Sequence, residues 1–151
     1  MPEIDVVSDA SVALKWFHSE GEDEVEPAHA LVAAHQARTI ALTVLDLTAY
    51  EIGNALLRGQ ANATAAQVAT VLEALDEICP AIRPDTAELN LAAELAARHD
   101  LTLYDAAYAA VAESRNATLA TLDSALLRVG LGRRPSELAS LLDLPGGGGR
   151  V

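Results

Sequence analysis

Short β-branched runs alternate with helical segments along most of the 151 residues, and this alternation limits the fold more than any other sequence feature. The runs "EIDVVSD", "TIALTVLDL", "CPAIRP" and "NATLATL" predict strands, the second of them over residues 40–44. Segments such as "NATAAQVATVLEALDEI" and "DTAELNLAAELAARHD" predict helices between them. Strands that alternate with helices favour a parallel sheet with helices on both faces, so we expect an α/β fold.

Polar residues stand just before most of the helical segments, where they can satisfy the free N–H groups of a first turn. We expect caps at Ser11, Thr48, Asp85, Asp105 and Asp123, and at either Asn62 or Thr64. Pro27 suits the first turn of its helix.

Length and composition indicate one domain over residues 1–144, followed by a Gly-rich tail, 145–151, that we expect to be disordered. No apolar run is long enough for a membrane span, and the N-terminus lacks the pattern of a signal peptide. Cys79 is the only cysteine, so we expect a buried core residue rather than a disulfide or a metal ligand. These features predict a cytoplasmic protein that contacts no membrane.

The formal net charge is −12, which argues against a long basic surface for nucleic acid. It does not argue against a nuclease whose acids are clustered in one cleft and neutralised by metal ions. An RNA substrate would then need a local basic rim, for which Lys15, Arg58, Arg133 and Arg134 are the candidates. The simpler alternative is that these four side chains are solvated surface charges.

Four acids lie where a parallel α/β sheet binds its ligands, at the carboxyl ends of the strands. Asp9 and Asp123 follow predicted strands, Asp105 begins a helix, and Glu51 lies early in the helix after the second strand. Each of these acids could instead have a purely structural role, as a helix cap or a solvated surface acid. Together, however, they would repel one another unless a cation neutralised them. A set of oxygen ligands suits Mg²⁺ or Mn²⁺ rather than Zn²⁺.

Such an ion can activate water for attack on a phosphodiester and stabilise the leaving oxygen. Other chemistries have weaker support in the sequence. The histidines have no metal-ligand spacing, and we expect them to be structural or surface residues: His18, His29, His35 and His99. No Gly-rich phosphate loop follows the first strand.

Four blocks of the sequence, "VVSDASVALKWF", "LTAYEIGNALLR", "LTLYDAAYAAVAE" and "ATLATLDSALL", resemble the PIN-domain family, and more narrowly its VapC-type toxins. The resemblance covers residues 4–144. It implies a three-layer α/β/α sandwich with a mainly parallel sheet, and a metal-dependent endoribonuclease of a toxin–antitoxin pair. The family's acids carry over to this chain as Asp9, Glu51, Asp105 and Asp123.

The resemblance also suggests supporting roles for Asn54, one turn after Glu51, and for Thr121, two residues before Asp123. Either residue can contact the ion or orient its ligands, and Glu51 either binds the ion or acts on the attacking water. The family further implies a homodimer and inhibition by a cognate antitoxin. The alternative is a catalytically silent PIN-like interaction module. A receiver-like signalling domain is disfavoured because Asp9 stands alone and no lysine lies near the last strand.

Overall fold

The computed structural model describes residues 3–17, 22–59 and 62–145, which form four strands and the helices between them. The strands are β1 (Ile4–Ser8), β2 (Ile40–Leu45), β3 (Ala81–Ile82) and β4 (Thr118–Ala120). The helices are α1 (Ala10–Ala13), the 3₁₀ turn η1 (Leu14–Phe17), α2 (Val25–Gln36), α3 (Leu47–Arg58), α4 (Ala65–Ile78), α5 (Thr86–His99), α6 (Leu103–Ser114), α7 (Ser124–Arg128) and α8 (Pro135–Leu141).

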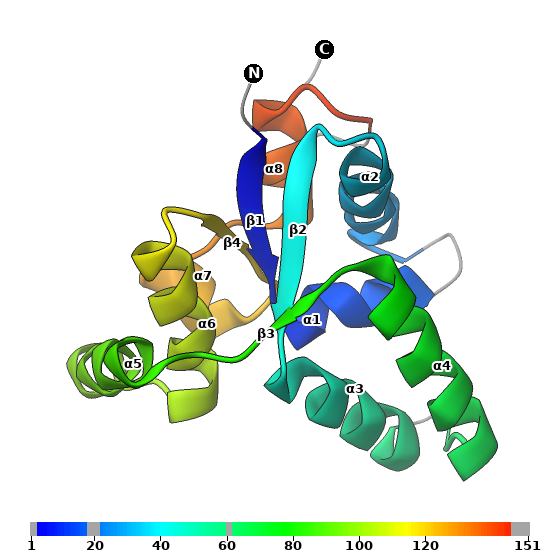
Figure 1. The fold of residues 1–151 in the computed structure, drawn as a ribbon, viewed down its shortest axis with the longest axis horizontal. Coiled ribbons are helices and arrows are strands. Elements are labelled where there is room, and N and C mark those ends of the chain that lie inside the picture. Colours follow the sequence, from blue (N-terminus) through cyan, green and yellow to red (C-terminus); the bar gives the residue numbers. More distant parts are fainter. Residues whose placement is uncertain (1–2, 18–21, 60–61, 146–151) are drawn as a thin grey trace.

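All four strands are parallel, and their order across the sheet is β3-β2-β1-β4. The central strand β1 pairs with β2 from Ile4 opposite Ile40, and with β4 from Val6 opposite Thr118. The carboxyl ends of the strands therefore share one edge, which lies at the lower end of β1 and β2 in Figure 1. We call it the carboxyl edge.

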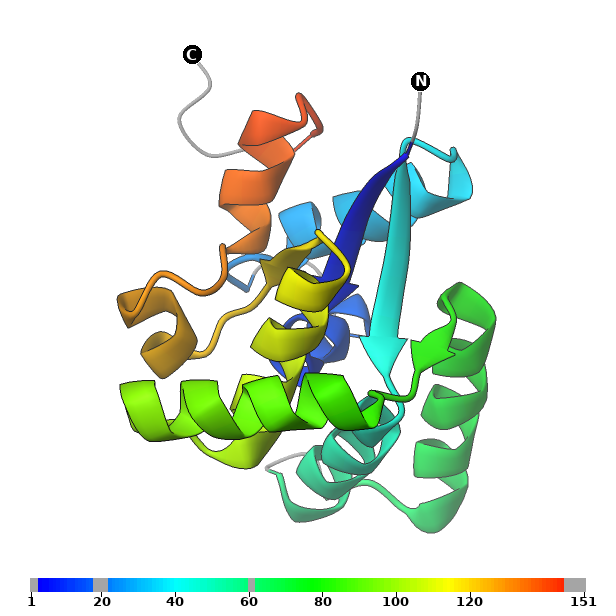
Figure 2. The same cartoon turned by 60° about the vertical axis from the view of Figure 1, so that its left-hand side comes forward.

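Helices cover both faces of the sheet, because successive strand residues point to opposite sides. Val6 packs in one core with residues of α1 to α4 and α8, whereas its neighbour Val7 packs in another with α5, α6 and α7. Figure 2 shows α4 and α5 on opposite sides of the strands. This arrangement confirms the expected three-layer α/β/α sandwich with a parallel sheet.

The middle of helix α6 is buried on all sides: every residue from Ala106 to Ala112 is at most 5% exposed. Five of these seven residues are alanines, so the helix can approach the sheet and α5 closely. The side chain of Thr102 caps α6 by accepting the N–H of Asp105 at 3.1 Å. The expected cap at Asp105 is therefore wrong: Asp105 lies three residues after the capping residue Thr102, inside the first turn of α6, and its carboxylate does not cap the helix.

Two other expected caps are also wrong. Ser11 lies inside α1, which Asp9 caps instead. Thr48 lies inside α3, and Asp46 precedes that helix without a side-chain cap. The cap of α4 is Thr64 rather than Asn62, with Gln67 as its reciprocal partner.

The remaining expected caps are confirmed. Asp123 accepts the N–H of Leu126 at the start of α7, and Asp85 caps α5. Pro27 lies in the first turn of α2.

Cys79 is buried in the core and unpaired, as expected. The imidazole Nδ1 of His35 accepts the N–H of Leu42, a structural contact. His18 and residues 146–151 of the expected tail lie outside the described residues. In the part of the chain that the structure describes, no helix has the length and apolarity that crossing a membrane requires.

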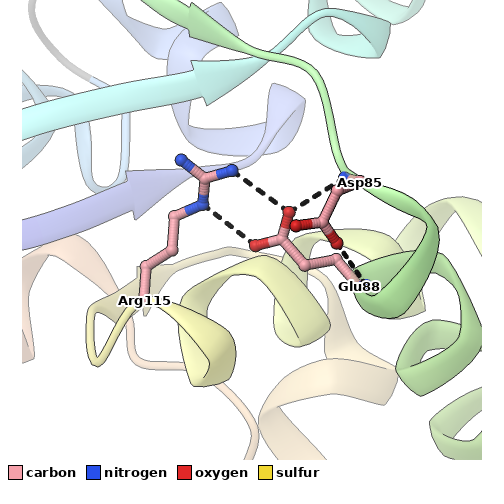
Figure 3. A network of polar contacts seen from close by, with 3 residues as sticks. All are labelled: Asp85, Glu88 and Arg115. Atoms are coloured by element: carbon pink, nitrogen blue, oxygen red, sulfur yellow. Dashed lines mark hydrogen bonds and ion pairs between the residues drawn. The ribbon is translucent and has the colours of Figure 1, made fainter.

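A buried carboxylate joins α5 to the end of α6 (Figure 3). Glu88 accepts two hydrogen bonds from the Arg115 guanidinium, at 2.9 and 3.1 Å, and its carboxylate also accepts the N–H of Asp85 at 3.0 Å. The Glu88 side chain is only 2% exposed, whereas that of Arg115 is 42% exposed. The bonds from Arg115 lower the pKa of Glu88 from 4.5 to about 2.

We expect Glu88→Gln to lower the free energy of unfolding at pH 7 by about 1–2 kcal/mol, since it removes a charge-assisted pair whose arginine is partly solvated. Because the pKa of Glu88 is depressed in the folded chain, its stabilising effect is present above pH 4.5 and is lost as the pH falls toward 2. The variant should therefore match the wild type near pH 2 and be less stable at pH 7. Urea unfolding at both pH values measures this.

Glu94→Gln, an exposed position of the same helix, is the matched control. An equal loss of stability in both variants would contradict a specific role for the Glu88–Arg115 pair.

Candidate functional site

The four predicted acids come from four different elements and meet at the carboxyl edge. Asp9 follows β1, Asp123 begins α7 just beyond β4, Glu51 lies in the second turn of α3 and Asp105 in the first turn of α6. Burial raises the pKa of Asp9, Glu51 and Asp105, and a neighbouring acid adds to each shift: Glu51 to that of Asp9, Asp105 to that of Glu51 and Asp123 to that of Asp105. The acids thus form one electrostatically connected group, which we call the carboxylate cluster.

Asp9 is the most buried member of the cluster, with an exposure of 4%. Its Oδ1 accepts the Ser11 hydroxyl at 2.5 Å and the N–H of Val12 at 3.2 Å, and its Oδ2 accepts the Thr121 hydroxyl. Burial raises the pKa of Asp9 from 3.8 to about 6, although these hydrogen bonds oppose the shift. The carboxylate is therefore held firmly but is costly to keep ionised.

Thr121 and Ser11 connect Asp9 to the segment after β4. The Thr121 oxygen accepts the N–H of Asp123 at 2.9 Å, and the Ser11 oxygen accepts the N–H of Leu122 at 2.8 Å. Both hydroxyls donate to Asp9. Thr121 thus contacts two members of the cluster, Asp9 directly and Asp123 through its backbone.

A chain of hydrogen bonds orients Glu51. The N–H of Leu45 donates to Thr48 Oγ1 at 3.1 Å, Thr48 contacts the Tyr108 hydroxyl at 2.7 Å, and Tyr108 donates to Glu51 Oε1 at 2.6 Å. An ionised Glu51 can only accept hydrogen bonds, so the single hydroxyl proton of Tyr108 is donated to Glu51. Thr48 must then donate to Tyr108. All the bonds run in one direction, from the end of β2 to the carboxylate.

No local sequence pattern indicates these contacts of Ser11, Thr48 and Tyr108. The sequence does signal that Tyr108 has a partner: it is a polar aromatic residue in an otherwise apolar, Ala-rich helix, one turn after Asp105. A buried Tyr hydroxyl usually has a partner. Burial raises the pKa of Tyr108 far above its usual value, so the hydroxyl remains a donor.

Asn54 lies one turn beyond Glu51 on α3, but its side chain is exposed. It borders a hollow that residues of α3, such as Tyr50 and Leu57, line together with Val68 and Leu72 of α4. In the described ranges it makes no hydrogen bond to the four acids.

The donor set of the cluster consists of carboxylate oxygens, which suit a hard divalent ion such as Mg²⁺ or Mn²⁺. Burial and mutual repulsion raise the pKa of Asp9, Glu51 and Asp105, and a bound cation would relieve the repulsion. Within residues 3–17, 22–59 and 62–145, no three Asp, Glu, His or Cys side chains stand close enough to form a ready-made cage. The residues fit a divalent ion in their chemistry, since Mg²⁺ usually keeps several water ligands and takes only one or two carboxylates directly.

We expect Asp9→Asn to stabilise the metal-free protein at neutral pH. The folded chain binds a proton on Asp9 more tightly than the unfolded chain, so the contribution of Asp9 to stability falls as the pH rises from 3.8 to about 6 and stays lower above it. The amide oxygen can accept the bonds from Ser11 and Val12 without a charge, whereas the amide NH₂ cannot accept the Thr121 hydroxyl, which must turn so that its oxygen accepts instead. Because one bond is rearranged, urea unfolding at pH 8 in EDTA should show a gain on the order of 1–2 kcal/mol, and at pH 4 almost none.

Asp76→Asn on the exposed face of α4 controls for the loss of a negative charge. A destabilised Asp9→Asn protein at pH 8 would contradict the inferred cost of ionising this carboxylate.

Comparisons with known proteins agree on one family. The family model described as PIN domain matches residues 6–131. Ribonuclease VapC3 of Pyrobaculum aerophilum is 34% identical over 125 residues, which cover 80% of this chain and 90% of that protein.

Two solved structures resemble the fold. The crystal structure of PAE2754 from Pyrobaculum aerophilum matches with a TM-score of 0.67 and 26% identity, covering 93% of this chain and 96% of that one. VapC20 of Mycobacterium tuberculosis, described as a sarcin–ricin loop cleaving toxin, matches with a TM-score of 0.61 and 14% identity, covering 83% and 95%. The family match, the VapC3 relative and the shared fold lead to one conclusion: the chain belongs to the PIN-domain family.

Proposed function

We propose that this protein is a Mg²⁺- or Mn²⁺-dependent endoribonuclease that hydrolyses RNA phosphodiester bonds and acts as the toxin of a toxin–antitoxin pair. The observation that carries the proposal is the carboxylate cluster, in which four acids from four elements stand at one edge of the sheet and three of them, Asp9, Glu51 and Asp105, have a raised pKa. The relative VapC3 is named a ribonuclease, and VapC20, which shares the fold, is described as a sarcin–ricin loop cleaving toxin. Both descriptions support the proposal.

In this mechanism Asp9, Asp105 and Asp123 would hold the divalent ion. A bound Mg²⁺ or Mn²⁺ lowers the pKa of water and stabilises the charge that develops on a leaving oxygen. Thr121 and Ser11 orient Asp9 through its two oxygens. These contacts would fix the most buried ligand before RNA arrives.

Glu51 either joins the ligands or takes the proton of the attacking water. Burial and the charge of Asp105 raise its pKa, which makes it a better proton acceptor. Tyr108 donates to Oε1. Among the residues that the structure describes, no hydrogen bond reaches the other carboxylate oxygen, which can therefore contact a water molecule. Tyr108 and Thr48 are positioning residues in this account.

We further propose a homodimer. Large apolar side chains are exposed along α3, α5 and the start of α6: Tyr50, Leu57, Leu89, Leu103 and Tyr104. They border two hollows that share Asp46, so the apolar surface continues from one helix to the next. Contiguous apolar surface of this kind marks an interaction site. A second copy of the chain would cover it.

A cognate antitoxin is the proposed protein partner. The cluster is acidic and the chain carries a net charge of −12, so arginine side chains of a partner would be attracted to it. The alternative to the toxin is a catalytically silent PIN-like interaction module. The presence of all four acids favours the nuclease.

We expect the purified protein to cut transfer, ribosomal or messenger RNA at fixed positions in Mg²⁺ or Mn²⁺ and to lose this activity in EDTA. Asp9→Asn should reduce the rate by at least about a hundredfold, because it removes one ligand charge from the site. Gel analysis of defined RNAs measures the cuts.

Asp76→Asn, which changes the same group on an exposed surface, should cleave like the wild type. An Asp9→Asn protein with full activity would point to a contaminating nuclease. A folded protein that binds Mn²⁺ and cuts none of these RNAs would favour the interaction module.

The dimer has a separate test. Leu89→Glu should place a charge in the apolar surface and yield a monomer of 15.8 kDa in sedimentation velocity, whereas the wild type sediments as a dimer. Leu141→Glu, at an exposed leucine of α8 outside this surface, should remain dimeric. Dimers in all three proteins would exclude this surface as the interface.

A further inference from the structure

A hollow of about 460 Å³ lies beside the outer edge of β4, outside the carboxylate cluster. Its walls include Thr118 and Leu119 of β4, Leu131, and the side chains of Arg133, Arg134 and Glu137. Its volume is in the range of pockets that bind small ligands. We call it the β4 hollow.

The hollow exists because the chain after α7 pairs with β4 at only one point. The N–H of Arg133 donates to the Leu119 carbonyl, and the N–H of Thr121 donates to the Arg133 carbonyl, both at 2.9 Å. Just before this point the N–H of Leu131 donates to the Leu126 carbonyl, so the chain turns away toward α7. The outer edge of β4 before this contact, at Thr118 and Leu119, therefore lines the hollow.

Gly132 allows the contact on which this geometry depends. A Cβ at this position would lie 2.5 Å from Thr121 Cγ2 and 3.2 Å from the Leu119 carbonyl oxygen. Only glycine lets the segment approach β4 so closely. Arg133 and Arg134 are consequently held at a fixed place beside Thr121.

The β4 hollow lies in the most basic part of an acidic chain. The segment "SALLRVGLGRRPS" has three arginines and no acid, although the whole protein has only ten lysines and arginines. Arg133 and Arg134 share one carboxylate, that of Glu137, at 3.9 and 3.8 Å. A single carboxylate leaves a surplus positive charge. The three side chains are about half exposed, and ion pairs in such positions are weak and exchange easily.

The hollow and the cluster are linked by a few residues of one extended segment. Thr121 contacts Arg133 through its backbone and Asp9 through its hydroxyl. Leu119, in the wall of the hollow, is separated from Asp123 by roughly 10–15 Å of extended chain. A few nucleotides of single-stranded RNA can span such a distance.

We propose that the β4 hollow binds a backbone phosphate of the RNA strand that flanks the cleaved bond, with Arg133 and Arg134 as its ligands. The inference rests on the proposed function. Guanidinium groups bind phosphate oxygens through paired hydrogen bonds, and the arriving phosphate replaces Glu137 as their partner. The hollow supplies the local positive charge that a cluster of carboxylates cannot offer to a polyanion.

Binding of a short fluorescein-labelled single-stranded oligoribonucleotide of mixed sequence, in EDTA so that it is not cut, tests the inference. The double variant R133A/R134A should bind roughly tenfold or more weakly than the wild type. The slope of log affinity against log salt should fall by about 0.7 for each lost phosphate contact. In Mg²⁺ its KM for RNA should rise while kcat changes little.

R38A/R98A removes two exposed arginines elsewhere and is the matched control, which should keep the wild-type slope. If both double variants bind the oligoribonucleotide equally weakly, the loss of affinity reflects only the change in net charge, and the proposal is overturned. Unchanged RNA binding in R133A/R134A would also overturn it, including the case in which this variant loses only its inhibition by an antitoxin.

The two proposals fail separately. If R133A/R134A cleaves RNA with the same KM and kcat as the wild type, the phosphate site is overturned and the nuclease proposal stands. Arginine-dependent RNA binding without any cleavage would support the phosphate site and contradict the nuclease. A wild type that binds no RNA would overturn both.

Discussion

The carboxylate of Asp9 connects three parts of the site: the end of β1, the start of α1 and the segment after β4. It caps α1 directly after the central strand, and it accepts the hydroxyls of Ser11 and Thr121, which reach the segment beyond β4. One buried group thereby fixes the end of β1, the start of α1 and the turn that carries Asp123. The same burial raises the pKa of Asp9 to about 6. The burial that lets Asp9 connect these segments therefore also makes its ionised carboxylate unfavourable unless a cation is bound nearby.

That conflict is typical of functional sites, where folding stability is given up for chemistry. Around Asp9, like charges are brought together rather than separated. Glu51 and Asp105 both have a raised pKa for the same reasons, burial and a neighbouring acid. Neutral hydrogen-bond donors such as Tyr108 and Ser11 hold the carboxylates without neutralising them. The carboxylate cluster thus retains an unsatisfied demand for positive charge.

The sequence was sufficient to predict the layers, the parallel sheet and the location of the acids, because strand and helix periodicities and strand-end residues are local patterns. The domain boundary at residue 144 and the roles of the site residues stay predictions. The errors concern which of several neighbouring polar residues caps a helix. Thr102 and Asp105 both suit the start of α6, and only the backbone path decides that Thr102 caps it. The contact between Thr48 and Tyr108 joins residues 60 positions apart, which no local pattern reports.

Helix α6 has a consequence for how this site can be lost. Asp105 and Tyr108, which serve the carboxylate cluster, stand on a helix whose other buried residues are almost all alanines. The methyl groups of Ala106, Ala107, Ala109 and Ala110 set how far the helix axis stands from the sheet and from α5. A single larger side chain there would push the whole helix outward and carry both polar groups with it. The unreactive methyl groups of these alanines thus determine where Asp105 and Tyr108 lie. A mutation of one alanine can therefore abolish the function of the site although all four acids are still present.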